Sequence, residues 1–191
     1  FFRSSISIET LGAANAGTLT INTGRLIVRD GADIATSALA NSSGAGGNLA
    51  INASESVEVI GTRPDGLSSS SISANSAGRG AAGNITITTG RLIVRDGGEV
   101  SAFTTGSGNG GTLAVNASES VEVIGTRANG GFGSSLTTDS GGMGVAGTLT
   151  ITTGRLIVRD GGEVSASTLG RGLGGTLEVN ASESVEVIGA G

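Results

Sequence analysis

An octapeptide that occurs three times constrains the fold of this chain more than any other feature. GRLIVRDG stands at residues 24–31, 90–97 and 154–161 and is identical each time. A second signature, NASESVEVIG, stands at 52–61, 116–125 and 180–189, so that the two alternate along a repeat of about 64 residues. Repeats of this kind are typical of solenoids and propellers, in which a unit buries its apolar face only against its neighbours.

Each long repeat divides into two units that begin with a glycine and an alternating apolar segment. In the first unit, apolar residues alternate with polar ones over three short stretches, beginning with Leu19 and Ile21. Period-two alternation over a few residues predicts a half-buried strand. The units are expected to open near Gly17, Gly47, Gly83, Gly111, Gly147 and Gly175.

These patterns predict an all-β fold, a parallel β-helix with about six coils of three short strands each. Residues 1–191 then form a single segment, a rod about 30 Å long at the usual spacing of ~4.8 Å between strands. A β-propeller is the alternative, but its blades have four strands and aromatic signatures that are missing here. Because the chain begins with Phe1 and both ends fall within repeat units, we expect a segment of a longer protein.

The composition excludes several kinds of chemistry. All 11 basic residues are arginines, against 16 acidic residues, and the sequence contains no His or Cys. An imidazole base, a thiol nucleophile, a Schiff-base lysine and a Cys/His metal cluster are therefore impossible. An acidic chain with four Phe as its only aromatic residues is not expected to bind nucleic acid. No apolar run approaches the ~18 residues needed to span a bilayer.

The octapeptide is interpreted as structural. If Leu26 and Val28 point inward, the flanking Arg25 and Arg29 point outward, and Glu58 of the next coil falls between them. Identical coils would stack like charges ~4.8 Å apart, whereas alternating Arg and Glu coils places opposite charges side by side. Each exposed pair contributes only ~0.5 kcal/mol, but the row fixes the register.

Two recurring polar positions allow more than one interpretation. Asp30, Asp96 and Asp160 each precede a glycine, which predicts an Asp-Gly turn; a calcium site is the alternative. No cofactor is expected otherwise. Asn52, Asn116 and Asn180 begin the sequence NAS, formally a glycosylation sequon, and are interpreted as turn or ladder asparagines.

The loops after the VEVIG strands are the variable parts of the repeat. They read TRPDGLSSSS and TRANGGFGSS. Variable loops on a rigid scaffold are where recognition is expected. The candidate recognition residues are Arg63, Asp65, Leu67, Arg127, Asn129 and Phe132.

The combination of GTLTINTGRLIVRDG with GTLAVNASESVEVIG resembles the repeat region of filamentous-haemagglutinin-like exoproteins, the secreted partners of two-partner secretion systems, especially the cyanobacterial type. The resemblance covers about residues 4–189. It implies a right-handed β-helix, export through an outer-membrane secretion pore, and an extracellular or cell-surface location. It also implies cell-surface glycans or proteins as partners. The Asn-Pro motifs of the family's secretion domain are absent, since the only proline is Pro64.

The expected function is a structural or adhesive fibre segment without catalysis, stacked on flanking coils of the same or of identical chains. A polysaccharide-acting β-helix enzyme is one alternative, but it needs a unique cluster of carboxylates, whereas the charges here recur with the repeat. An ice-binding solenoid is the other. Its threonine lattice, which includes Thr18, Thr20, Thr86 and Thr88, is interrupted by Ala50 and Ala114.

Overall fold

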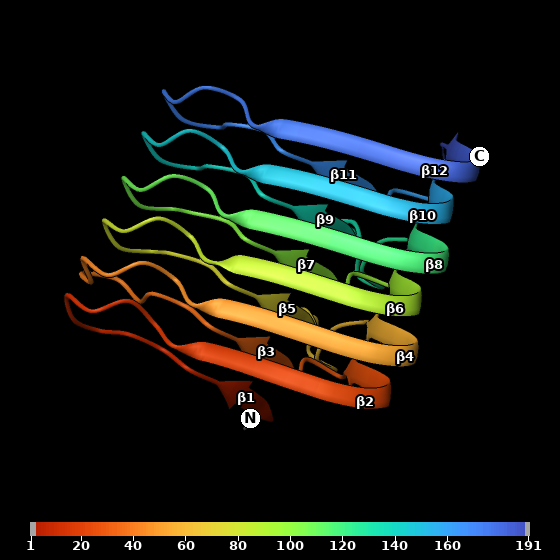
Figure 1. Cartoon of the computed structure of the whole chain (residues 1–191), viewed down its shortest axis with the longest axis horizontal. Coiled ribbons are helices and arrows are strands. Elements are labelled where there is room, and N and C mark those ends of the chain that lie inside the picture. The colour runs from red at the N-terminus through yellow and green to blue at the C-terminus, as the bar shows by residue number, and fades with distance from the viewer. Residues whose placement is uncertain (1–2, 190–191) are drawn as a thin grey trace.

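The computed structural model describes residues 3–189, which form two parallel β-sheets of six strands each (Figure 1). The long strands stack in the order β12-β10-β8-β6-β4-β2, and the short ones in the order β1-β3-β5-β7-β9-β11. Among these residues no helix is present, so the all-β prediction is confirmed and the two stacked sheets are consistent with a parallel β-solenoid. The long strands are β2 (Thr18–Arg29), β4 (Asn48–Ile60), β6 (Asn84–Arg95), β8 (Thr112–Ile124), β10 (Thr148–Arg159) and β12 (Thr176–Ile188). The short strands are β1 (Ser5–Ser7), β3 (Asp33–Ala35), β5 (Ser71–Ser73), β7 (Glu99–Ser101), β9 (Ser135–Thr137) and β11 (Glu163–Ser165).

The coils contain fewer separate strands than the sequence predicted. The first two expected strands of each coil are one continuous strand, which Figure 1 shows curling back toward its C-terminal end. The pairing register shifts at that bend, between Thr23 and Arg25 on β2 and between Ala53 and Ser56 on β4. β4, β8 and β12 have 13 residues and the others 12, so the extra residue forms a bulge that lets the two kinds of coil stack.

The apolar residues of the alternating pattern fill the interior, as predicted. In the central coil, Ile85, Ile87, Leu92 and Val94 of β6 are fully buried, and Val100 of β7 closes the column from the second sheet. Burial of a side chain of this size stabilises the fold by about 1.5–3 kcal/mol. The stack is therefore held together mainly by this continuous apolar column.

Five of the six glycines that open the units, all except Gly17, are required by the close approach of successive coils. Each long strand begins one residue after such a glycine. The Gly83 amide donates a hydrogen bond to the Ala74 carbonyl at 2.6 Å, and a Cβ atom at Gly83 would overlap the carbonyl oxygen of Gly47 in the preceding coil. Any side chain at this position would push two coils apart.

Candidate functional site

The predicted charge row is present, but it is less regular than expected. Glu58 pairs in register with Ile27, and its Oε1 lies 2.7 Å from Nη2 of Arg25. Arg29, predicted to flank the same glutamate, instead lies 3.5 Å from the carboxylate of Asp30 in its own coil. The register was thus predicted correctly, while only one of the two arginines contacts Glu58.

The later repeats use a different glutamate. Arg91 lies 3.8 Å from Glu119, and Arg155 lies 3.7 Å from Glu183. Both glutamates lie within the bulge, at positions of β8 and β12 that have no register partner on β10, so the bend of the strand supplies the carboxylate. These exposed pairs add little to stability. Their role is to complement charge between adjacent coils.

The three recurrent aspartates form tight turns. Asp30, Asp96 and Asp160 have φ values of 57°, 57° and 55°, and the glycines that follow are also at positive φ. The turn is closed by hydrogen bonds such as that from the Gly98 amide to the Arg95 carbonyl, 3.1 Å. Positive φ at both central residues is the geometry that Asp-Gly favours, which confirms the turn interpretation. No cluster of three or more potential metal-ligating His, Cys, Asp or Glu side chains occurs within residues 3–189.

The two variable loops, residues 61–70 and 125–134, are small hairpins of the same design. Each is closed by an antiparallel bridge, Thr62 to Ser69 in the first and Thr126 to Gly133 in the second. A serine anchors each base: the Ser134 hydroxyl donates to the Ile124 carbonyl at 2.7 Å and accepts from the Gly97 amide at 3.0 Å. Neither serine was predicted as a functional residue. The only indication of their role in the sequence was the run of serines at the end of each loop.

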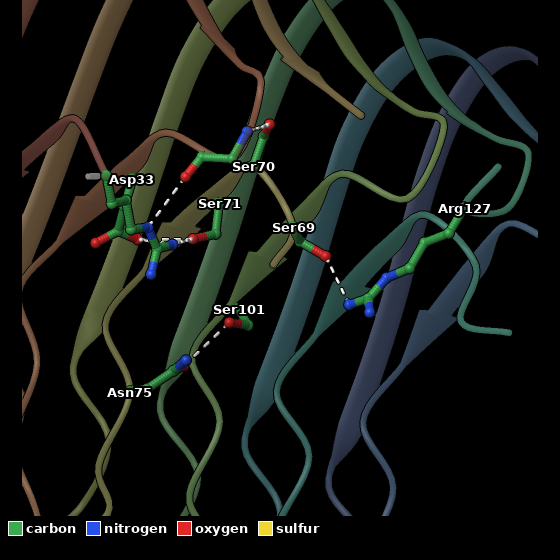
Figure 2. Close-up of polar contacts among 9 residues, drawn as sticks. Asp33, Ser69, Ser70, Ser71, Asn75, Ser101 and Arg127 are labelled. Carbon is green, nitrogen blue, oxygen red and sulfur yellow. Dashed lines mark hydrogen bonds and ion pairs between the residues drawn. The ribbon is translucent and has the colours of Figure 1, made fainter. Parts of the chain in front are cut away.

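The two hairpins also contact each other. The Arg127 guanidinium donates a hydrogen bond to the Ser69 hydroxyl at 2.8 Å, as Figure 2 shows. A Cβ atom at Gly66 would lie 2.7 Å from the Asn129 side-chain nitrogen. Although the hairpins are separated by an intervening coil, they form one composite surface, which we call the paired loops.

A pocket of about 430 Å³ lies between the paired loops. Of the predicted recognition residues, Arg63, Asp65 and Asn129 line it. The Arg63 side chain binds Asp65 in a two-point arrangement, with nitrogen–oxygen distances of 2.6 and 2.9 Å. Hydrogen bonding to Arg63, and secondarily to the Leu67 amide, lowers the pKa of the Asp65 carboxyl. The pair presents a fixed, ionised carboxylate at the pocket wall.

The other three predicted residues do not line the pocket. Leu67 and Phe132 are 74% and 76% exposed on the hairpins. The Arg127 guanidinium carbon lies 5.3 Å from the centre of the Phe132 ring, a cation–π distance. Arg127 therefore holds the two hairpins together and supports an exposed aromatic side chain.

Other polar side chains tie neighbouring coils together below the loops. The Ser71 hydroxyl donates to the Asp33 carboxylate at 2.6 Å, and the Ser101 hydroxyl donates to the side-chain Oδ1 of Asn75 at 3.1 Å (Figure 2). Asp33 also lies 3.0 Å from the Arg3 guanidinium. Each contact joins adjacent coils and satisfies its polar groups, so these residues are structural.

A second concave surface, which the sequence did not predict, runs along the bend of the long strands. It is a shallow, open hollow of about 980 Å³, lined by residues from each of the six long strands. We call it the axial groove. It shares no lining residue with the pocket of the paired loops.

Comparisons of the chain with models of protein families, with curated proteins and with solved structures gave no match. Within residues 3–189 there is no helix long and apolar enough to cross a membrane.

Proposed function

We propose that the chain is a rigid, right-handed β-helical segment of a secreted or surface-exposed adhesive fibre of the filamentous-haemagglutinin-like type, without catalytic activity. The sequence resemblance supports the class of protein. The observation that carries the proposal is the contrast between a uniform stack of coils and two hairpins that project from it and touch each other. A repeated scaffold that presents one composite loop surface has the form of a recognition module.

The chemistry of the paired loops suits a partner with mixed polar and apolar groups. Asp65 and Asn129 offer hydrogen-bonding groups at the pocket, while Leu67 and Phe132 are exposed beside it. Aromatic residues and arginine are enriched in protein interfaces, and the face of an aromatic ring also packs against the C–H groups of sugar rings. Cell-surface glycans or proteins are therefore the proposed partners.

The charged residues favour a structural role over catalysis. On the long strands, arginines and carboxylates recur with the repeat and lie in exposed pairs such as Arg91 with Glu119. A glycoside-cleaving site needs two carboxylates set apart from the repeat around one sugar. The periodic pairs are explained by the stacking of charged coils, so we propose no reaction for this chain.

The test is attachment of beads coated with the whole chain to cells. In one variant, each hairpin is replaced by the Asp-Gly turn that occupies the same place in the alternate coils. Phe132→Ala and Asn129→Ala are the single substitutions, and Met143→Ala, also at an exposed side chain but outside the hairpins, is the matched control. Attachment should fall in the hairpin variants and persist in the control. Unchanged attachment without the hairpins would contradict the proposal.

A further inference from the structure

We propose that the axial groove binds an extended, uncharged polysaccharide that lies parallel to the axis of the stack. This goes beyond the role of the paired loops, because the groove lies at the strand bend and uses different residues. Its outer row, one residue per coil in parallel register, consists of Asn22, Asn52, Thr88, Asn116, Thr152 and Asn180.

The outer row offers regularly spaced hydrogen-bonding groups. Successive members are separated by the interstrand spacing of ~4.8 Å, a length similar to that of one sugar unit in an extended chain. Asn52 already donates a hydrogen bond to Asn22, and Asn180 donates one to Glu178. Within the described part of the molecule, the exposed side chains of Thr88, Asn116 and Thr152 make no hydrogen bond to the protein. An amide supplies two donors and an acceptor, and a hydroxyl supplies one donor and two lone pairs. These groups match the hydroxyls of a sugar chain.

The inner row gives the groove a compact floor. The inner row consists of the residues that follow the outer row in sequence. In the central coils Ala53 and Ala117 alternate there with Thr89 and Thr153, and each of the four is at most 6% exposed. The threonine hydroxyls are already used: Thr89 donates to the Arg91 carbonyl at 3.3 Å, and Thr153 to the Arg155 carbonyl at 3.2 Å. The lining as a whole is more apolar than polar, which suits the C–H faces of pyranose rings between polar edges.

The lining carries no charge that would attract an ionic polymer. Every residue that lines the groove is uncharged. The nearest ionised groups include carboxylates: Glu119 Oε1 would lie 3.5 Å from a Cβ atom at Gly90, and Glu183 Oε1 3.4 Å from one at Gly154. These carboxylates are paired with Arg91 and Arg155, so the margin has no net charge that would balance uronate or sulfate groups, and a neutral glycan is favoured.

The backbone selects against a peptide strand. Along the groove, the inner strands β4, β6, β8 and β10 each pair with a neighbour on both sides. A peptide that binds by strand addition requires a free sheet edge, and the side of a fully paired sheet does not supply one. Recognition must therefore come from side chains, and these are amides, hydroxyls and methyl groups.

The experiment titrates the whole chain with neutral hexasaccharides (cellohexaose, chitohexaose and mannohexaose) and with polygalacturonate, by calorimetry and by NMR shifts. Ser118→Trp is designed to fill the exposed wall of the groove, and the double change Thr88→Ala with Asn116→Ala removes free hydrogen-bonding groups. Controls are Thr86→Ala, exposed on the same strand as Thr88 but outside the lining, and Met143→Trp, which adds the same ring elsewhere.

At least one neutral hexasaccharide should bind, and both groove variants should weaken it about tenfold or more, the effect of losing one to two net hydrogen bonds. The two controls and the hairpin replacements should leave the affinity unchanged, which separates this proposal from the role of the paired loops. Three results would overturn it: no binding of any neutral hexasaccharide, preference for polygalacturonate, or undiminished binding by Ser118→Trp with a native circular dichroism spectrum.

Discussion

The threefold octapeptide allows one core position to be tested in identical local sequence. Leu92 is fully buried at the centre of the stack, whereas Leu26, at the same place in the first copy, is only partly buried. Replacing a fully buried leucine with alanine removes its transfer free energy and leaves a cavity, so Leu92→Ala should cost about 3–4 kcal/mol of unfolding free energy. Leu26→Ala, with less burial to lose, should cost about 1–2 kcal/mol.

The assay is urea denaturation of the 191-residue chain, followed by circular dichroism. Because the flanking residues are the same, intrinsic strand preference cannot explain a difference between the two variants. Leu67→Ala, at a 74% exposed side chain, should change stability by less than about 0.5 kcal/mol. Equal costs at Leu26 and Leu92 would refute the reasoning, because they would show that the column is no better closed in the middle than at its first coil.

Three further predictions concern backbone and charge. Gly83→Ala should lower the unfolding free energy by more than about 2 kcal/mol, because a Cβ atom there overlaps the preceding coil. Gly12 has open space around it, so Gly12→Ala should lower the unfolding free energy by less than ~1 kcal/mol. Both values are measured by urea denaturation. Asp96→Ala should lower the unfolding free energy by about 1 kcal/mol because residue 96 has a positive φ, whereas Asp96→Asn should be tolerated. The melting temperature of each variant should be the same in calcium and in chelator. A loss of calcium-dependent stabilisation in Asp96→Asn would contradict the turn interpretation. The pKa of the Asp65 carboxyl, followed by NMR, should lie below the usual value near 3.9. The stability that its ionised form contributes to the fold is present above that value and is lost as the pH falls through the lowered pKa. Arg63→Gln should return the pKa toward its ordinary value.

The features that follow from period and register were predictable from the sequence. The inward positions of Ile87 and Val94 required only the alternation of apolar residues, and the pairing of Glu58 with Ile27 required only that these positions be aligned. The Asp-Gly turn was predictable because few other residues adopt positive φ. The presence of two variable loops was visible too, although their mutual contact was not. The Arg127–Ser69 bond joins residues 58 positions apart, through the spacing of coils that a local pattern does not contain.

The bend of the long strands shows what the sequence pattern could not supply. Alternation continues on both sides of Gly24, so the sequence suggested two strands with a break, yet the backbone pairing runs through it. Opposite that glycine the next coil has one residue more, and the ladder absorbs the difference as a bulge. At Gly90 a Cβ would lie 2.6 Å from the Glu55 carbonyl oxygen, so the glycine is needed because the neighbouring coil bulges toward it. The bulge at the bend is therefore determined only when the two kinds of coil are stacked on each other. The axial groove follows from this stacking, because long strands of 12 and 13 residues that bend at the same place leave a continuous hollow, which neither repeated motif specifies alone.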